Sequence, residues 1–278
     1  MKYVSIAAPP KPATQFLVEI CLRENWFDSD DEAHEAAERW LERFLSELQD
    51  EANRLRSLGR FVFFDFNSSS TSYLQGPAFV EPSDDAYLTR HKQQISRVAN
   101  YHSHLADLTP GEFEKLCAGV LRLLGVQNPE CTQMSNDQGI DFFGRLAIGS
   151  ALVPEQIRPN FEAQMYVWLV GQAKHYQRAS VSTSAIRELV GSVELARGRA
   201  YSTGGSIFSG LHIRISDPVY CLFFCTGTLS AGIWRLLENS GVIGMDGNMV
   251  AAFLATNDVG VSQGVFDRVL FSRWLDQN

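Results

Sequence analysis

The chain has 278 residues, of which 45% are hydrophobic and 11% aromatic, and its formal net charge is −8. This composition excludes an intrinsically disordered chain, and no apolar run reaches the ~20 residues that a membrane-spanning helix needs. The start of the chain lacks a charged segment followed by an apolar one, so we expect a cytoplasmic protein without a membrane partner. Five cysteines without a Cys-x-x-Cys pair indicate reduced core thiols and argue against zinc.

The first hundred residues are predicted to be mainly helical. A short helix is expected over 14–26, and a long acidic amphipathic helix over 30–58. Residues 60–66 form an aromatic run typical of a strand, and residues 67–76 are expected to form a polar loop. A further helix is predicted over 84–105, and a domain boundary is expected between residues 107 and 108.

Residues 1–107 contain 17 acidic and 11 basic side chains and no catalytic motif. Two interpretations of this part remain open. It is either an interaction or regulatory domain, which docks a partner protein or another copy of the chain, or a helical extension packed on the rest of the molecule.

A helix start is encoded at Thr109. Thr109 is expected to be the N-cap, Pro110 occupies the first helical position, and Glu112 stands at the capping-box spacing. Apolar residues then recur at helical spacing until Gly125. Glu114 lies at the edge of this apolar stripe, and taken alone it is interpreted as a solvated carboxylate that the helix dipole favours.

Two apolar runs, 140–148 and 165–175, are predicted to be buried strands that pair as antiparallel neighbours. Alternation along the second strand places Gln172 and Lys174 on the same face. A buried ammonium needs an anion or a solvated cleft, and Asp141 on the adjacent strand is the candidate partner. The pair is interpreted either as a structural ion pair between two strands or as part of a functional site.

Several of these fragments, taken in order, resemble the signature elements of the Mrr-like restriction endonucleases, a branch of the PD-(D/E)XK nuclease superfamily. The matching fragments are Phe113-Glu-Lys-Leu116, Asp137-Gln-Gly-Ile-Asp141 and Gln172-Ala-Lys-His-Tyr176. Residues 220–230 and 241–247 are similar to the late strand, helix and short strand of the family. The resemblance covers about residues 108–256.

The resemblance implies an α/β fold with a restriction-endonuclease-like mixed central sheet flanked by helices, preceded here by the mainly helical N-terminal domain. Residues 108–278 would be the nuclease domain, which hydrolyses phosphodiester bonds of DNA, most simply double-stranded, in bacterial restriction or anti-phage defence. Asp141 would be the metal-binding aspartate, Gln172 would replace the acidic residue of the third motif, and Lys174 would be its lysine. Glu114 would be the helix-borne acid, with Glu112 as the fallback.

Mg²⁺, or Mn²⁺ in its place, is the implied cofactor, because oxygen ligands suit these hard cations. Asp141, Gln172 and Glu114 would supply those oxygens. Lys174 would either stabilise charge in the transition state or orient the attacking water.

Three further residues are candidates for contact with the substrate: Tyr176, Arg178, and Arg187 on a helix expected over 185–200. Asp137 is assigned to a turn. The alternative function is a non-catalytic nucleic-acid-binding or scaffolding protein, which retains the nuclease fold and keeps Asp141 and Lys174 as a structural pair. A terminal helix is predicted over 265–275.

Overall fold

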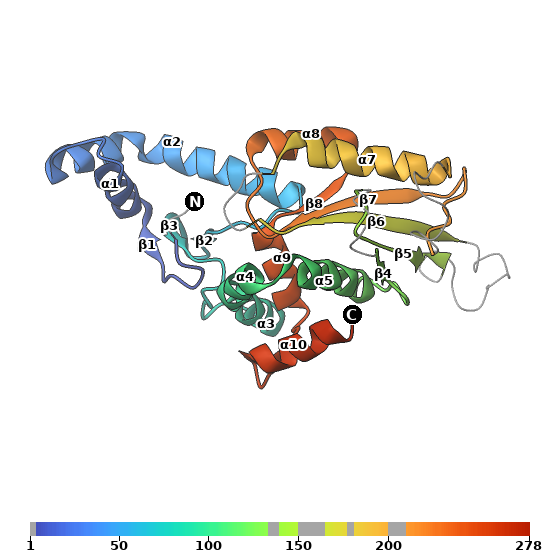
Figure 1. The fold of residues 1–278 in the computed structure, drawn as a ribbon. Coiled ribbons are helices and arrows are strands. Elements are labelled where there is room, and N and C mark those ends of the chain that lie inside the picture. Colours follow the sequence, from blue (N-terminus) through green and yellow to red (C-terminus); the bar gives the residue numbers. More distant parts are fainter. Residues whose placement is uncertain (1–3, 133–138, 150–164, 177–180, 200–209) are drawn as a thin grey trace. The chain divides into compact units, whose positions relative to one another are not determined.

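The computed structural model describes residues 4–132, 139–149, 165–176, 181–199 and 210–278. Contacts divide the chain into two compact units, Met1–Ala99 and Asn100–Asn278, which we call the front unit and the rear unit (Figure 1). None of the helices in the described ranges is long and apolar enough to cross a membrane. The roles predicted for the two parts of the chain remain predictions.

A helical hairpin dominates the front unit. The two predicted helices are present as α1 (Ala13–Arg23) and α2 (Asp30–Ser57). They pack on each other, and small buried residues such as Cys21, Ala33 and Ala37 let them approach closely. Ser29 is the N-cap of α2, and its side chain accepts a hydrogen bond from the backbone of Glu32. Three acidic residues in the first turn of α2 complement the positive end of the helix dipole.

The small sheet of the front unit corrects two predictions. Its described strands are β1 (Lys11–Pro12), β2 (Asp65–Asn67) and β3 (Ser70–Gln75), in the antiparallel order β1-β3-β2. The strand predicted over 60–66 is wrong except for its last two residues, and the loop predicted over 67–76 is wrong because most of it is β3. The polar side chains of β3 face solvent while Leu74 and Gln75 are buried, so composition concealed the strand.

The single helix predicted over 84–105 is also wrong. The structure has two helices, α3 (Ala86–Ile95) and α4 (Val98–Asp107). Ser96 ends α3, and its hydroxyl donates to the carbonyl of Gln93 at 2.7 Å. A serine that bonds to the local backbone competes with continuation of the helix, which explains the break.

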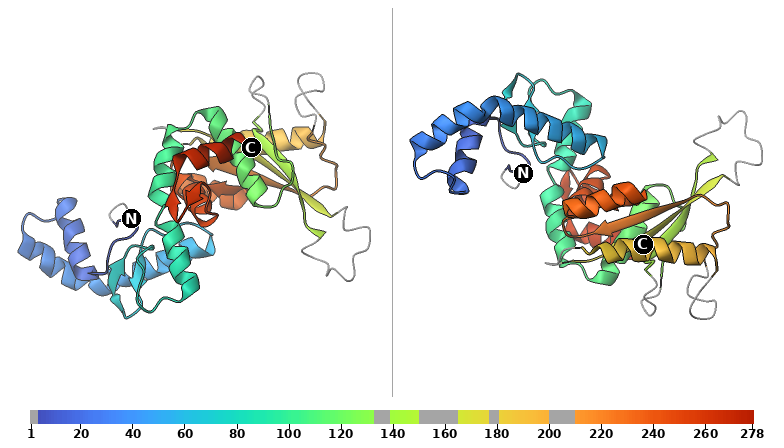
Figure 2. Two further views of the ribbon diagram at one scale, coloured as in Figure 1. Left: turned by 90° about the horizontal axis from the view of Figure 1, so that it is seen from below. Right: turned by 90° about the horizontal axis from the view of Figure 1, so that it is seen from above.

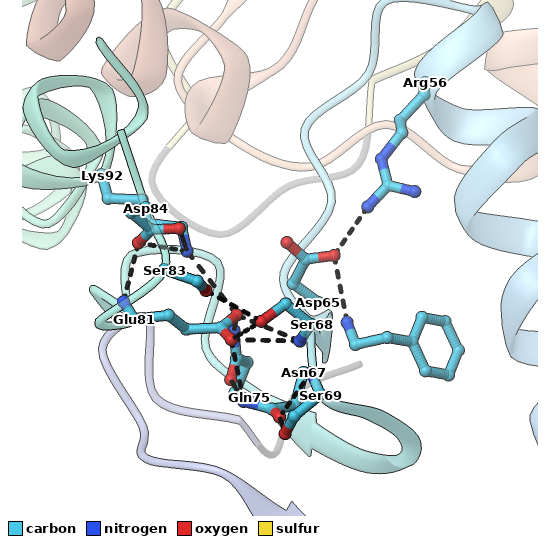
Figure 3. Close-up of polar contacts among 11 residues, drawn as sticks. Arg56, Asp65, Asn67, Ser68, Ser69, Gln75, Glu81, Ser83, Asp84 and Lys92 are labelled. Carbon is cyan, nitrogen blue, oxygen red and sulfur yellow. Dashed lines mark hydrogen bonds and ion pairs between the residues drawn. The ribbon is translucent and has the colours of Figure 1, made fainter. Parts of the chain in front are cut away.

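A buried polar network joins β2 and β3 to the segment before α3 and to the last turn of α3 (Figure 3). Lys92 Nζ lies 2.8 and 3.0 Å from the two carboxylate oxygens of Asp84 and 3.8 Å from Glu81. Glu81 accepts hydrogen bonds from the amide of Gln75 at 2.5 Å, from the amide of Asn67 at 3.1 Å, and from the backbone and hydroxyl of Ser68. The side chains of Lys92, Glu81 and Asp84 are at most 7% exposed. Every one of the three buried charges is therefore compensated.

The rear unit is built on a mixed sheet, which confirms the predicted fold class. Among the described residues the sheet has five strands in the order β4-β5-β6-β7-β8, and their bounds are β4 (Glu130–Cys131), β5 (Phe142–Ala147), β6 (Tyr166–Lys174), β7 (Val219–Cys225) and β8 (Ile243–Met245). Strand β5 is antiparallel to β4 and β6, whereas β6, β7 and β8 run parallel. The antiparallel pairing of β5 with β6 is the pairing predicted from the sequence.

Helices cover both faces of this sheet (Figures 1 and 2). Helix α5 (Pro110–Leu123) lies on one face, and α7 (Thr183–Arg197) and α8 (Ala231–Ser240) lie on the other. Trp168, Val170 and Phe223 from the sheet pack with apolar residues of α7 and α8 in one buried cluster. Layers of this kind protect a sheet with a parallel part on both sides from water.

The remaining elements close the rear unit beside α5 and β7. They are α9 (Gly247–Thr256), the short hairpin of β9 (Val261–Ser262) and β10 (Val265–Phe266), and α10 (Arg268–Asp276). The predicted terminal helix is therefore confirmed from Arg268 onward, while its first two residues belong to a strand. Asp246 is the N-cap of α9 and accepts hydrogen bonds from the backbone of Asn248 and Met249, as expected for an Asp-Gly turn.

The five cysteines are free thiols. Cys21, Cys117 and Cys225 are buried and Cys221 is half-buried, whereas Cys131 is exposed. The prediction of reduced thiols in the core therefore fails for Cys131, which lies on the short edge strand β4.

Candidate active site

The register of β5 and β6 brings Asp141 to the same end of the sheet as Lys174. Asp141 directly precedes β5, and its backbone N–H donates to the carbonyl of Gly171 at 2.9 Å. Phe142 then pairs with Gly171 across the ladder, three residues before β6 ends at Lys174. Gly171 is required here, because a Cβ at this position would lie 2.1 Å from the ring of Phe142.

The carboxylate of Asp141 is held by the backbone of β6. Its Oδ2 accepts a hydrogen bond from the N–H of Ala173 at 2.7 Å, so the side chain takes the place of a main-chain acceptor in the ladder. Thr132, the residue after β4, supports the same residue, with its N–H donating to the carbonyl of Asp141 at 2.9 Å. Asp141 is only half-buried, so its carboxylate is positioned without being sealed in the core.

Gln172 and Lys174 lie on the same face of β6, as alternation predicts. Gln172 is fully buried. In the amide orientation that satisfies both of its partners, Gln172 Oε1 accepts from Lys174 Nζ at 3.1 Å and Nε2 donates to the carbonyl of Ala185 on α7 at 3.0 Å. Lys174 is half-buried. Gln172 therefore connects the ammonium group to the first turns of α7 and fixes its position.

Glu114 completes the group from α5. It is half-buried, and its pKa is raised above the ordinary glutamate value, first by burial and then by the negative charge of Asp141, while the positive charge of Lys174 lowers it. Glu114, Asp141 and Lys174 therefore lie within electrostatic range of one another. The buried thiol of Cys117, one turn along α5, has a pKa raised by burial and by neighbouring negative charges that include both carboxylates.

Glu112, the fallback for Glu114, has a different role in the structure. It is exposed and completes the predicted capping box, because Thr109 N–H and hydroxyl both donate to its carboxylate at 2.7 Å. These hydrogen bonds lower the pKa of Glu112. The two glutamates, two positions apart on α5, therefore have opposite pKa shifts and face different surroundings.

Of the three predicted substrate-contact residues, the structure describes Tyr176 and Arg187. Tyr176 is half-buried, its ring packs against the apolar cluster beneath α7 and α8, and its N–H donates to Thr226 Oγ1 at 3.0 Å. Arg187 is exposed on α7. Arg178 lies outside the described residues, as does Asp137. Their proposed contacts with the substrate remain predictions.

His175 lies on the face opposite Lys174. Its Nε2 is 3.3 Å from the carbonyl of Leu105, and its ring centroid is 6.2 Å from that of Phe113. These contacts pack His175 against Leu105 and Phe113.

The donor set fits a hard divalent cation. In the described ranges, no three His, Cys, Asp or Glu residues form a cluster that could hold a metal ion. The candidate ligands are instead two carboxylates, those of Glu114 and Asp141, and the amide oxygen of Gln172. Mg²⁺ keeps several waters and needs only one or two protein carboxylates, so this smaller set is sufficient. The Gln172 oxygen has a second lone pair besides the one that faces Lys174.

Residues 105–204 of the chain match the Mrr_cat family model, described as restriction endonuclease. The resemblance to Mrr-like restriction endonucleases is thus confirmed over a segment that contains Glu114, Asp141, Gln172 and Lys174. The fragments at 220–230 and 241–247 lie beyond this segment.

Two solved structures are similar to the chain. One is the MspJI restriction endonuclease in complex with a 27-mer oligonucleotide, at 20% identity and a TM-score of 0.41. The other is the DNA modification-dependent restriction endonuclease AspBHI, at 18% identity and a TM-score of 0.38. The similarity covers 70% and 68% of this chain but only 39% of each of those chains. No curated protein matches the sequence.

Sequence reasoning missed the two hydrogen bonds that hold the site together. The bond from Ala173 to Asp141 and the bond from Gln172 to Ala185 both depend on how distant segments meet. The available signal was the presence of two polar side chains, Gln172 and Lys174, at the end of an otherwise apolar strand.

Proposed function

We propose that this protein is a metal-dependent endonuclease that hydrolyses phosphodiester bonds of DNA. The observation that carries the proposal is the convergence of Asp141, Gln172 and Lys174 at one end of the β5–β6 pair, with Glu114 in electrostatic range. The match of residues 105–204 to a restriction endonuclease model supports DNA as the substrate. Double-stranded DNA is the proposed form.

Three residues are proposed to bind the metal ion. Asp141, Glu114 and the amide oxygen of Gln172 would hold Mg²⁺, or Mn²⁺ in its place, which when bound acidifies a water and neutralises charge on the phosphate oxygens. Asp141 is already oriented by Ala173 N–H. Burial and the negative charge of Asp141 raise the pKa of Glu114, so a cation bound beside it would favour its ionised form.

Lys174 is proposed to act on the phosphate group. Its ammonium is held by Gln172 at 3.1 Å, and the side chain remains half-buried and open to solvent on part of its surface. A fixed positive charge of this kind either stabilises the charge that develops in the transition state or orients the attacking water. We favour stabilisation, because a positioned ammonium group supplies positive charge where negative charge develops on the phosphate oxygens.

The biological setting is part of the proposal. A nuclease of this family would act in the cytoplasm in bacterial restriction or anti-phage defence, and the acidic residues 1–107 would form an interaction or regulatory domain that binds a protein partner or another copy of the chain.

Nicking of supercoiled plasmid DNA tests the proposal. We expect cleavage in Mg²⁺, loss of cleavage in EDTA, and loss in Asp141→Asn, which keeps the hydrogen bond to Ala173 but removes the charge. Asp276→Asn, which removes an exposed carboxylate at the end of α10, serves as the matched control and should cleave normally.

A second readout separates an inactive effector from a non-catalytic scaffold. A ligand that binds the native state raises the stability of the protein, so Mg²⁺ should raise the melting temperature of the wild type and not that of Asp141→Asn. A wild-type protein that neither cleaves DNA nor is stabilised by Mg²⁺ through Asp141 would support the alternative, a scaffolding protein with Asp141 and Lys174 as a structural pair.

A further inference from the structure

A basic cavity lies at the end of β6 opposite the candidate active site. Its volume is about 830 Å³, and its lining includes Tyr166, the first residue of β6, together with Arg197, Arg199 and Arg214. Lys174 is the last residue of the same strand, so at ~3.3 Å per residue the two sites are roughly 26 Å apart. Distance alone makes the cavity a separate site.

A buried carboxylate organises the cavity wall. Asp217, whose side chain is 4% exposed, accepts hydrogen bonds from the N–H and the Nε of Arg214 at 2.9 Å, and from Trp168 Nε1 and the hydroxyl of Tyr166 at 3.2 Å. Arg214 also donates to the Tyr166 hydroxyl, while its side chain stays 65% exposed. The guanidinium group is thus held in one orientation and still presented to solvent.

Two further arginines supply charge that this carboxylate does not neutralise. Arg197 and Arg199 lie at the end of α7. Arg197 donates to the carbonyl of Ile215 at 3.2 Å, and its nearest acidic partner, Glu194, is exposed and 4.0 Å away. The Nε of Arg197 is buried and has no hydrogen-bond partner among the described residues. Within the described ranges, Arg199 makes no ion pair.

The positive charge continues past Tyr166. The guanidinium of Arg145 lies 3.5 Å from the centroid of the Tyr166 ring, on an exposed part of β5. Arg145 and Tyr166 also line a neighbouring cavity of about 430 Å³, whose lining includes one acidic residue, Glu130. In the sequence, the whole stretch between Glu194 and Asp217 contains no acidic residue. In a chain with a net charge of −8, this segment is a local exception.

We propose that this cavity binds phosphate groups through Arg197 and Arg199, with Arg214 as a fixed third donor. Arginine suits this ligand because its planar guanidinium matches phosphate oxygens with two parallel hydrogen bonds. The phosphates come either from the DNA backbone beyond the cleavage point or from a free nucleotide. Only the DNA source rests on the proposed function. For that source, a span of roughly 26 Å corresponds to about eight base pairs.

Binding measurements in EDTA, where no cleavage is expected, test the proposal. The probes are a fluorescent 30-base-pair duplex, followed by anisotropy, and pyrophosphate and ATP, followed by calorimetry. The test variant is Arg197→Gln with Arg199→Gln. The matched control is Arg235→Gln with Arg273→Gln, which removes two exposed arginines from α8 and α10. Circular dichroism checks that both variants fold.

We expect the test variant to bind at least one probe about tenfold more weakly than the wild type does, while the control stays within about twofold. If the DNA backbone is the source, the slope of log affinity against log salt should fall by about 2, because each phosphate contact contributes about 0.9. If the source is a free nucleotide, ATP and pyrophosphate binding should weaken while duplex binding is unchanged.

Equal binding of all three probes by the test and control variants would overturn the proposal. Arg214→Gln is the second variant, because it leaves α7 intact and should weaken the same probe. Failure of this proposal is distinguishable from failure of the proposed nuclease function, since the cavity variants leave Asp141 and Lys174 unchanged and the plasmid-nicking assay measures those residues separately.

Discussion

The two units of this protein each place a lysine beside carboxylates, with opposite results. In the front unit Lys92 is 5% exposed at its side chain and lies 2.8 Å from Asp84, and its network is saturated with hydrogen bonds (Figure 3). In the rear unit Lys174 is half-buried, and the hydrogen bond identified for its ammonium is donated to the neutral amide oxygen of Gln172. The arrangement around Lys92 is typical of a structural ion-pair network, whereas the ammonium of Lys174 stays partly accessible to solvent.

The carboxyl groups near the two lysines have pKa values shifted in opposite directions. Burial acts to raise the pKa of Glu81, but hydrogen bonds from Ser68 and Gln75 and the charge of Lys92 outweigh it and lower the pKa. Asp84 behaves in the same way, with Lys92 as its main hydrogen-bond partner. For Glu114, burial and the charge of Asp141 prevail and the pKa is raised. A carboxylate with a raised pKa beside a lysine is the better candidate for a functional site.

The largest effect is expected from Lys92→Met. Removing the cation leaves Glu81 and Asp84 buried without their partner, and breaking a buried pair in this way costs about 3–5 kcal/mol of unfolding free energy. Urea unfolding should show this loss, whereas Lys115→Met, which removes an exposed lysine on α5, should change stability by less than about 0.5 kcal/mol. A small effect at Lys92 would mean that the front network is not structural.

Lys174→Met should have the opposite pattern to Lys92→Met, with a large effect on DNA cleavage and a small effect on stability. We expect cleavage to fall by a factor of about 10²–10³ or more, as for loss of one preorganised donor to a transition state, while the unfolding free energy changes little. Plasmid nicking by a variant with a wild-type circular dichroism spectrum is the measurement. Retained cleavage would remove Lys174 from the mechanism, and a large loss of stability would place it with Lys92.

The pH dependence of stability should separate Glu114 from Glu81. A carboxylate whose folded pKa is raised contributes stability at low pH that is lost as pH rises through that pKa, so Glu114→Gln should be more stable than the wild type at pH 7 in EDTA. A carboxylate whose folded pKa is lowered contributes stability above its unfolded pKa, so Glu81→Gln should be less stable at pH 7.

The difference at Glu114 should shrink as pH falls through its raised folded pKa, whereas the difference at Glu81 should persist to lower pH, because hydrogen bonds and the charge of Lys92 lower the folded pKa of that carboxyl. Urea unfolding at pH 7 checks the two signs, and a series toward lower pH checks this order. Shifts of the same sign at Glu114 and Glu81 would contradict the contrast between the two lysine sites.

The smallest effect is expected at Glu112. Glu112→Ala removes half of the capping box at Thr109 and should cost about 1 kcal/mol, with no change in cleavage. Glu114→Ala, two positions along, should instead reduce cleavage. Equal loss of activity in the two variants would mean that α5 contributes through its stability and not through a particular carboxylate.

Local sequence signals predicted much of the fold. Thr109 caps α5 as expected, because a cap requires only residues a few positions apart. The long apolar runs of β5 and β6 were also sufficient to predict two buried strands and their pairing. Predictions failed where polar residues form a strand, as in β3, and where Ser96 interrupts a helix.

For the candidate site, the sequence by itself determined which residues are proposed for the chemistry, because Asp141, Gln172 and Lys174 occur in the order and strand context of a known family. Only the tertiary structure decided how they are held: Ala173 fixes Asp141, Ala185 fixes Gln172, and α5 brings Glu114 within range of both charges. It alone revealed the network around Lys92 and the basic cavity around Asp217. Electrostatic environment depends on residues that are distant along the chain, and a local pattern does not encode which of them meet.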